Sequence, residues 1–148
     1  MNNVDTIMQL INWERSEEEQ REGLAMARDL KCIRTFFQPS GPGYSKSVWE
    51  NCARIICERS DDELRPYVFD MMLWLQDLNW PGAMKIQHRL MQFSDVRFIA
   101  NTIDEMIPAL IAVNEISWLM SIADLLDNSK LMEELSDASV QILSRFQR

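Results

Sequence analysis

Side chains that could carry out chemistry are few in this sequence and stand far apart. The one histidine, His88, lies in the strongly polar run of residues 85–89, where an exposed helical position is expected. Catalysis by a nucleophile and a histidine base would have to use this residue. The chain also contains no G-x-S-x-G, no glycine-rich phosphate loop and no H-E-x-x-H motif. We therefore predict no catalytic residues and no enzyme activity.

The three cysteines, Cys32, Cys52 and Cys57, form no C-x-x-C pair. Cys52 and Cys57 are five residues apart, which places them on different faces of a helix. With a single histidine in the chain, the usual zinc sites are hard to assemble. We expect no metal and no cofactor, and three unpaired, mostly buried thiols in a cytoplasmic protein.

Carboxylates are abundant, but their positions favour capping over catalysis. A catalytic pair needs two acids converging on one cleft with their pKa values pushed apart. Here the acids gather at helix starts, because the runs at residues 16–19 and 60–63 both match the capping box. The net charge of −8 argues against nucleic-acid binding and would steer a basic protein partner. The acids that we select as candidate partner contacts are Asp61, Asp62, Glu63, Asp104 and Glu105.

The run W-L-Q-D-L-N-W-P at residues 74–81 combines two tryptophans, an acid and a proline. In one interpretation Asp77, Asn79 and Trp80 lock a turn between two helices, and Trp74 and Trp80 are largely buried. In the other, Trp74, Asp77 and Trp80 form part of a recognition surface. Asp77 is expected in the last turn of a helix, where the dipole disfavours an anion, so helix-start amides or a basic side chain such as Lys85 or Arg89 should compensate it.

Apolar residues recur at spacings of three and four almost throughout, and alternation with period two is absent. This pattern predicts an all-α fold of about eight helices in antiparallel hairpins, forming a single domain over residues 1–148. Pro66 is tolerated in the first turn of the helix that the second capping box opens, and Pro81 begins the next helix. Pro108 is expected to kink or split its helix, and Asn114 to cap the following one. Such hairpins either close as a compact helical bundle or stack as a HEAT-like α-solenoid.

Targeting signals and membrane spans are not expected. The N-terminal residues lack the basic and apolar regions of a signal peptide. No apolar run approaches the ~18 residues of a membrane-spanning helix. These features predict a cytoplasmic location and no membrane partner.

The run at residues 74–81, W-L-Q-D-x-N-W-P, resembles the signature of an uncharacterised bacterial family of small helical proteins. The resemblance extends over residues 48–126 and includes W-E-N-C-A at residues 49–53 and Trp118-Leu119. Gly82 departs from the pattern, which favours valine at that position. The resemblance implies a HEAT-like fold. Because some members lie beside polymorphic toxins, it also implies a candidate role as an immunity protein.

Three classes of function are compatible with these features. The favoured hypothesis is a non-catalytic protein-binding domain, namely an immunity protein that neutralises a basic bacterial toxin domain by stoichiometric binding. An acidic inhibitor of a basic toxin would gain electrostatic steering. The alternatives are an adaptor or oligomerisation domain and an enzyme that works through carboxylates alone.

Overall fold

A computed structural model describes residues 3–41 and 43–147, and every regular element in these ranges is helical. The prediction of an all-α fold is therefore confirmed. The α-helices are α1 (Asn3–Leu10), α2 (Glu17–Arg28), α3 (Trp49–Cys57), α4 (Asp61–Leu64), α5 (Val68–Trp74), α6 (Ala83–Met91), α7 (Val96–Ala112), α8 (Ile116–Ala123), α9 (Ser129–Glu134) and α10 (Asp137–Ser144). Short 3-10 turns are η1 (Arg34–Phe36), η2 (Gln38–Ser40), η3 (Lys46–Val48), η4 (Arg65–Tyr67) and η5 (Asp124–Asp127).

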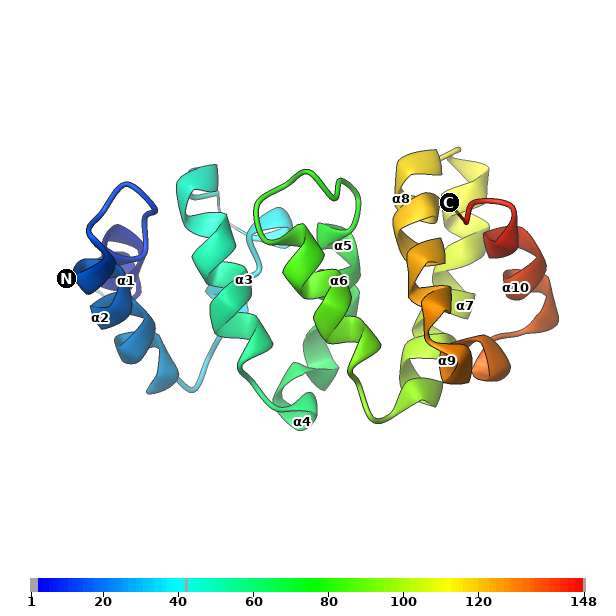
Figure 1. Cartoon of the computed structure of the whole chain (residues 1–148), viewed down its shortest axis with the longest axis horizontal. Coiled ribbons are helices and arrows are strands. Elements are labelled where there is room, and N and C mark those ends of the chain that lie inside the picture. The colour runs from blue at the N-terminus through cyan, green and yellow to red at the C-terminus, as the bar shows by residue number, and fades with distance from the viewer. Residues whose placement is uncertain (1–2, 42, 148) are drawn as a thin grey trace.

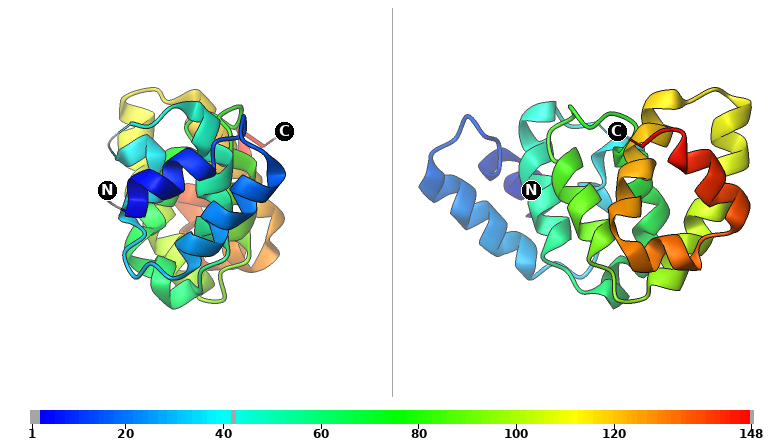
Figure 2. Two further views of the ribbon diagram at one scale, coloured as in Figure 1. Left: turned by 90° about the vertical axis from the view of Figure 1, so that its left-hand side faces the viewer. Right: turned by 45° about the vertical axis from the view of Figure 1, so that its right-hand side comes forward.

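The helices are arranged in a row along the longest axis of the molecule (Figure 1). α1 and α2 form one end, α3 and α6 pack side by side in the middle, and α7 to α10 form the other end. α5 packs on α6 and also contacts α7, and a view turned by 45° shows the same order (Figure 2). Both predicted arrangements are built from packed helices, and a HEAT-like solenoid geometry for this row stays a prediction.

Buried apolar side chains form one continuous core cluster that runs from Ile7 in α1 to Leu143 in α10. Burial of apolar surface is the main force that holds such helices together, since helices this short are marginal on their own. Within the described ranges no helix is long and apolar enough to cross a membrane.

Two arginines tie successive helices together along one edge of the row. Arg59 donates from Nη2 to the carbonyl oxygens of Ala27 and Leu30, at 2.8 and 2.9 Å, where α2 ends. Arg89, in the last turn of α6, donates to the carbonyl oxygen of Arg59 at 2.9 Å. These guanidinium groups supply donors to carbonyls at a helix end and at turns, and cations suit the negative end of a helix dipole.

Two of the predicted helix starts are capped as the sequence indicates. Ser60 and Glu63 form the complete capping box that opens α4. Ser16 accepts from the Glu19 amide at 3.1 Å, but the carboxylate of Glu19 accepts from the Ser16 hydroxyl instead of its amide. The second box is therefore confirmed in full and the first in its forward half.

Two proline positions differ from the sequence-based expectation, and at a third, Pro108, one of the two expected outcomes is excluded. Pro66 does not lie in a continuous α-helix, because residues 65–67 form the 3-10 turn η4 before α5 begins. A proline lacks the amide that an α-helix would use and its ring crowds the preceding turn. Pro81 does not begin α6, which starts after Gly82. Pro108 does not split its helix, since α7 continues from Val96 to Ala112.

Asn114 closes α7 and does not cap the next helix as predicted. It has a left-handed backbone with φ of 57°. The Glu115 amide donates to the carbonyl of Leu110 at 2.9 Å, and the Asn114 amide donates to that of Ile111 at 3.0 Å. This pair of bonds is the Schellman motif, in which asparagine can take the position usually held by glycine. The expectation failed because asparagine suits both helix ends.

Candidate functional site

The turn between α5 and α6 is locked by the residues of the W-L-Q-D-x-N-W-P run. Trp74 is fully buried, as predicted, and its indole Nε1 donates to the carbonyl oxygen of Pro81 at 3.0 Å. Asp77 lies beyond the end of α5, and its carboxylate accepts from the Asn79 amide at 2.8 Å. Asp77 therefore needs neither Lys85 nor Arg89, which pair elsewhere.

Gly82 makes this turn possible. Its φ is 84°, a region that favours glycine, and a Cβ atom at this position would lie 2.5 Å from the Cβ of Ala53. The carbonyl oxygen of Trp49 would lie 3.0 Å from the same atom. A valine, which the family resemblance favours at this position, does not fit this chain.

Trp80 is only partly buried, so the prediction that it is largely buried is too strong. Its ring meets that of Trp49 edge-on, with centroids 5.4 Å apart. The Nζ of Lys46 lies 5.9 Å from the Trp80 centroid and 5.7 Å from that of Trp49. The lysine therefore covers part of the aromatic surface that the run would offer to a partner.

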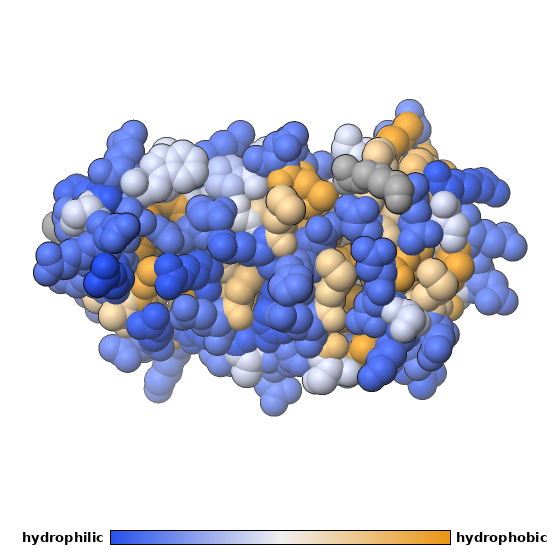
Figure 3. Space-filling view, in the orientation of Figure 1, coloured by the Kyte–Doolittle hydropathy of each residue, from blue (hydrophilic) through white to orange (hydrophobic). Residues whose placement is uncertain are grey.

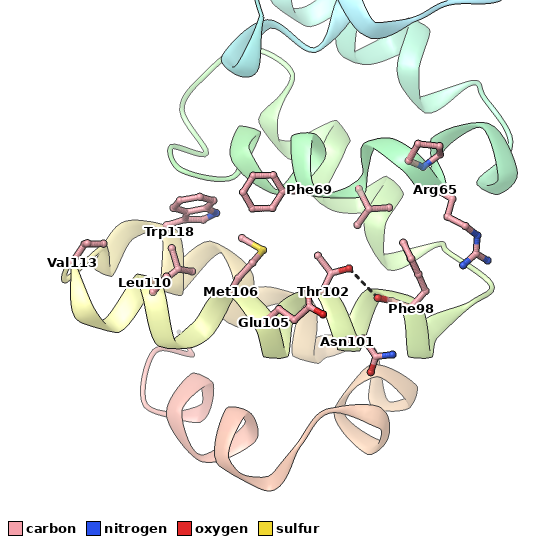
Figure 4. A pocket seen from close by; sticks show the side chains of 13 residues that line it. Arg65, Phe69, Phe98, Asn101, Thr102, Glu105, Met106, Leu110, Val113 and Trp118 are labelled. Atoms are coloured by element: carbon pink, nitrogen blue, oxygen red, sulfur yellow. Dashed lines mark hydrogen bonds between the residues drawn. The ribbon is translucent and has the colours of Figure 1, made fainter.

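A recess with a volume of about 820 Å³ lies between α5 and α7. We call it the α5–α7 groove. Figure 4 shows side chains of α7 along one wall, Phe69 on the opposite wall and Trp118 of α8 toward one end. The lining residues are Arg65, Pro66, Val68, Phe69, Phe98, Asn101, Thr102, Glu105, Met106, Ala109, Leu110, Val113 and Trp118.

Apolar side chains of the groove are strongly exposed. Phe69 is 53% exposed and Val113 65%, although large apolar side chains are normally buried. Ile111 and Ile116, on either side of the α7–α8 turn, are also exposed. Figure 3 shows apolar atoms at the end where α7 meets α8, on a face that is otherwise mainly hydrophilic. The groove therefore exposes apolar side chains both on α5 and at the C-terminal end of α7.

Polar groups in the groove are mostly engaged already. Arg65 pairs with Asp95 at 2.8 Å, and its guanidinium carbon lies 4.5 Å from the centroid of the Phe98 ring. Hydrogen bonds from Arg65 and from the Phe98 amide lower the pKa of Asp95. The Thr102 hydroxyl donates to the carbonyl oxygen of Phe98 at 3.0 Å. Glu105 is exposed and has no ion pair within the described part of the chain.

A comparison with known protein families identifies the family of this chain. A family described as a domain of unknown function, DUF5071, matches residues 49–146. The chain belongs to this family. The expectation of an uncharacterised family is thereby confirmed, and the DUF5071 match reaches from α3 through α10, so it includes both the locked turn and the groove. No curated protein and no solved structure matches the chain.

The acids that we select from the sequence have different roles in this DUF5071 domain. Asp61 is a structural tie: its carboxylate accepts from Arg89 at 2.7 Å and from the Ser94 amide and hydroxyl at 2.9 and 2.8 Å. Glu63 caps α4 and pairs with Arg59 at 2.9 Å. Asp62 is exposed beside them.

The second acidic pair divides between two roles. The Asp104 carboxylate accepts from the amide of Ser136 at 3.3 Å and from its hydroxyl at 3.0 Å, which ties α7 to the start of α10. Glu105 lines the groove from α7 (Figure 4). Of the candidate residues Asp61, Asp62, Glu63, Trp74, Asp77, Trp80, Asp104 and Glu105, only Glu105 lines the groove.

The cysteines are free among the described residues, so the prediction that they are unpaired is confirmed. Cys52 is buried and Cys57 partly so, and burial raises the pKa of Cys57 to about 11 and that of Cys52 further. Cys32 is exposed, against the expectation of mostly buried thiols. In the described ranges no three His, Cys, Asp or Glu side chains are grouped in a way that could hold a metal ion.

Proposed function

We propose that this chain is a non-catalytic protein-binding domain whose α5–α7 groove holds a segment of a partner protein. The observation that carries the proposal is the exposure of Phe69 and Val113 on either side of an apolar recess. Partner contacts concentrate where apolar and aromatic side chains can be fully desolvated in a pocket. The ring of Trp118, held at the end of the groove, adds a rigid aromatic wall.

A finer role for this domain is that of an immunity protein. The family resemblance at residues 74–81 supports this role, together with the net charge of −8. Several of the basic residues pair internally, for example Lys85 with Glu50 and Arg28 with Glu58. Toxins that attack nucleic acids are basic, so an acidic inhibitor associates with them faster and blocks them by occupancy. Neutralisation then follows a fixed stoichiometry, without turnover.

The proposal is tested by capture with groove variants. Tagged wild type and the double variant Phe69→Ser/Val113→Ser are incubated with lysate of the source cells, and the retained proteins are identified. Both positions are exposed, so the helical spectrum should not change. The matched control is Met84→Ser, which removes an apolar side chain that is 69% exposed on α6, outside the groove. We expect one partner retained in a small fixed ratio by wild type and Met84→Ser, and lost with the double variant.

Capture that does not depend on Phe69 and Val113 would contradict the proposed site. The immunity role is tested separately by co-expression with a basic toxin domain encoded beside this protein. Growth rescue by wild type, lost with the double variant, supports that role. Rescue at substoichiometric levels of this protein would contradict it.

A further inference from the structure

We infer that the segment held by the α5–α7 groove is an amphipathic helix of about four turns with lysine or arginine along one flank. The inference rests on the proposed protein-binding function and specifies its partner. Three observations lead to it: the shape of the groove wall, the charge left over at its rim, and the net charge of the chain itself.

The groove wall is one face of a long helix. Lining positions recur at spacings of three and four along α7 and its C-cap residue, namely Phe98, Thr102, Met106, Ala109 and Val113. This stripe is about 22 Å long at 1.5 Å per residue. An apolar strip of this length between two helices fits a third helix with apolar residues at i, i+3, i+4 and i+7. Addition of a strand would need an exposed sheet edge, and the described ranges contain no strand.

The charge left over at the groove is negative. Arg65, the one basic residue of the lining, is neutralised by Asp95 and covered by the Phe98 ring on one side. Glu105 stands on the same wall without an ion pair among the described residues. Residues 101–148, which form most of α7 and everything after it, carry eight acidic and three basic residues. They therefore hold five of the eight net negative charges of the chain.

This distribution of charge favours one kind of molecule in the groove over another. A second copy of the chain would bring another charge of −8 to the groove, and the two copies would repel each other. A helix with lysine or arginine beside its apolar stripe would gain an ion pair with Glu105 and burial against Phe69 and Val113. Charged residues at the rim mainly accelerate association, while the apolar strip holds the complex.

The test uses three fluorescent peptides of about 16 residues with blocked ends. The first carries leucines at i, i+3, i+4 and i+7 and lysines on the flanks. The second replaces each lysine by glutamate, and the third is a scrambled sequence of the first. Fluorescence anisotropy measures their affinity for the wild type, Glu105→Lys, the matched charge control Glu22→Lys on α2, and Phe69→Ser/Val113→Ser.

We expect the lysine peptide to bind at a ratio of one to one, about tenfold tighter than either other peptide, and more weakly as salt rises. Glu105→Lys should weaken its binding about threefold or more, beyond the change caused by Glu22→Lys. Phe69→Ser/Val113→Ser should abolish it. Equal binding of the glutamate peptide, or equal effects of the two reversals, would overturn the basic helix while groove-dependent partner capture still upheld the proposed function.

Two further outcomes would assign a different molecule to the groove. Sedimentation that shows a wild-type dimer which Val113→Ser dissociates would make a second copy the occupant. Native mass spectrometry that shows a bound fatty acyl chain, absent from Phe69→Ser/Val113→Ser, would make the groove a lipid site. Lysine-peptide binding that is unaffected by the double substitution would overturn both the inference and the proposed site.

Discussion

The indole Nε1 of Trp118 donates to the main-chain carbonyl oxygen of Met72 at 2.9 Å, joining α8 to α5. The bond is buried, and the ring that makes it also forms the end of the α5–α7 groove. The same side chain therefore fixes the distance between two helices and the shape of the recess between them. We therefore expect stability and the proposed partner binding to be coupled at this position.

Trp118→Phe removes the indole hydrogen bond but keeps most of the volume of the aromatic side chain. The carbonyl of Met72 keeps a second donor, the Leu75 amide at 3.0 Å, so it is not left unsatisfied. We expect a loss of about 1 kcal/mol in the free energy of unfolding, the usual net value of one hydrogen bond. Partner binding should weaken as well, because the end wall of the groove is no longer held. Urea denaturation and the capture assay measure the two effects.

Gly82→Ala should destabilise the fold strongly. The backbone conformation alone costs a residue with a side chain about 1 to 3 kcal/mol, and the added Cβ would collide with the Cβ of Ala53. Gly43→Ala is the matched control, since a Cβ there meets no atom within 4 Å. Equal melting temperatures for the two variants would show that the turn relaxes freely.

Trp74→Ala and Trp80→Ala should differ, although both residues belong to the same run. Trp74 is fully buried and bonded to Pro81, so its truncation should cost about 3 to 5 kcal/mol. Trp80 loses mainly an edge-on contact with Trp49, so we expect a smaller cost of about 1 to 2 kcal/mol. Chemical denaturation of both variants provides the comparison. A Trp80→Ala variant of unchanged stability that fails to bind the partner would assign the run to recognition.

Acid should destabilise the ties at the start of α4. Partial burial raises the pKa of Asp61, but hydrogen bonds from Ser94 and Arg89 outweigh it and leave that pKa below the ordinary value. The hydrogen bond from Arg59 likewise lowers the pKa of Glu63. A carboxyl whose pKa is lowered by folding stabilises the folded state above its unfolded pKa of about 4, and this contribution is lost as the pH falls toward the folded value.

Asp61→Asn should therefore flatten the decline in unfolding free energy below about pH 4, and it should lower stability at pH 7. Asp62→Asn, a substitution at the exposed neighbour, is the control. Urea titrations between neutral pH and pH 3 would reveal the difference. Parallel curves for Asp61→Asn and the wild type would remove Asp61 from the acid response.

The helical fold could be predicted from the sequence because its signals are local. The Ser60 capping box and the apolar stripe that includes Val68 and Met71 depend only on residues a few positions apart. Asn114 shows the limit of such reasoning, since the same residue type suits either end of a helix and only packing decides. A turn locked at Asp77 and Asn79 was foreseeable as one of two interpretations, whereas the hydrogen bond from Trp74 to Pro81 was not.

The groove could not be predicted, because it is created by the separation of α5 and α7. Phe69 and Val113 are ordinary apolar residues in the sequence, and nothing local indicates that the partner wall lies too far away to cover them. The one available signal was the position of Phe69 around its helix. Because Phe69 directly follows the buried Val68, it lies outside the row of residues that α5 buries. Acid clusters were a poor guide, because Asp61 and Asp104 are occupied by internal bonds.

Asp104 and Glu105 provide the sharpest test of that distinction, since they are neighbours with equal charge and different partners. Asp104→Lys removes the acceptor of the Ser136 amide and hydroxyl at the start of α10, so it should cost about 1 to 2 kcal/mol of stability. Glu105→Lys should leave the melting temperature within a degree or so, because the exposed side chain has no such bond.

The effects of the two substitutions on partner binding should be reversed. Glu105→Lys should slow association with a basic partner and reduce the salt dependence of the association rate, since exposed charges are screened beyond ~8 Å at physiological ionic strength. Thermal melts and stopped-flow association at two salt concentrations measure both properties. If Asp104→Lys slowed association as much as Glu105→Lys did, the effect would belong to net charge and not to the groove.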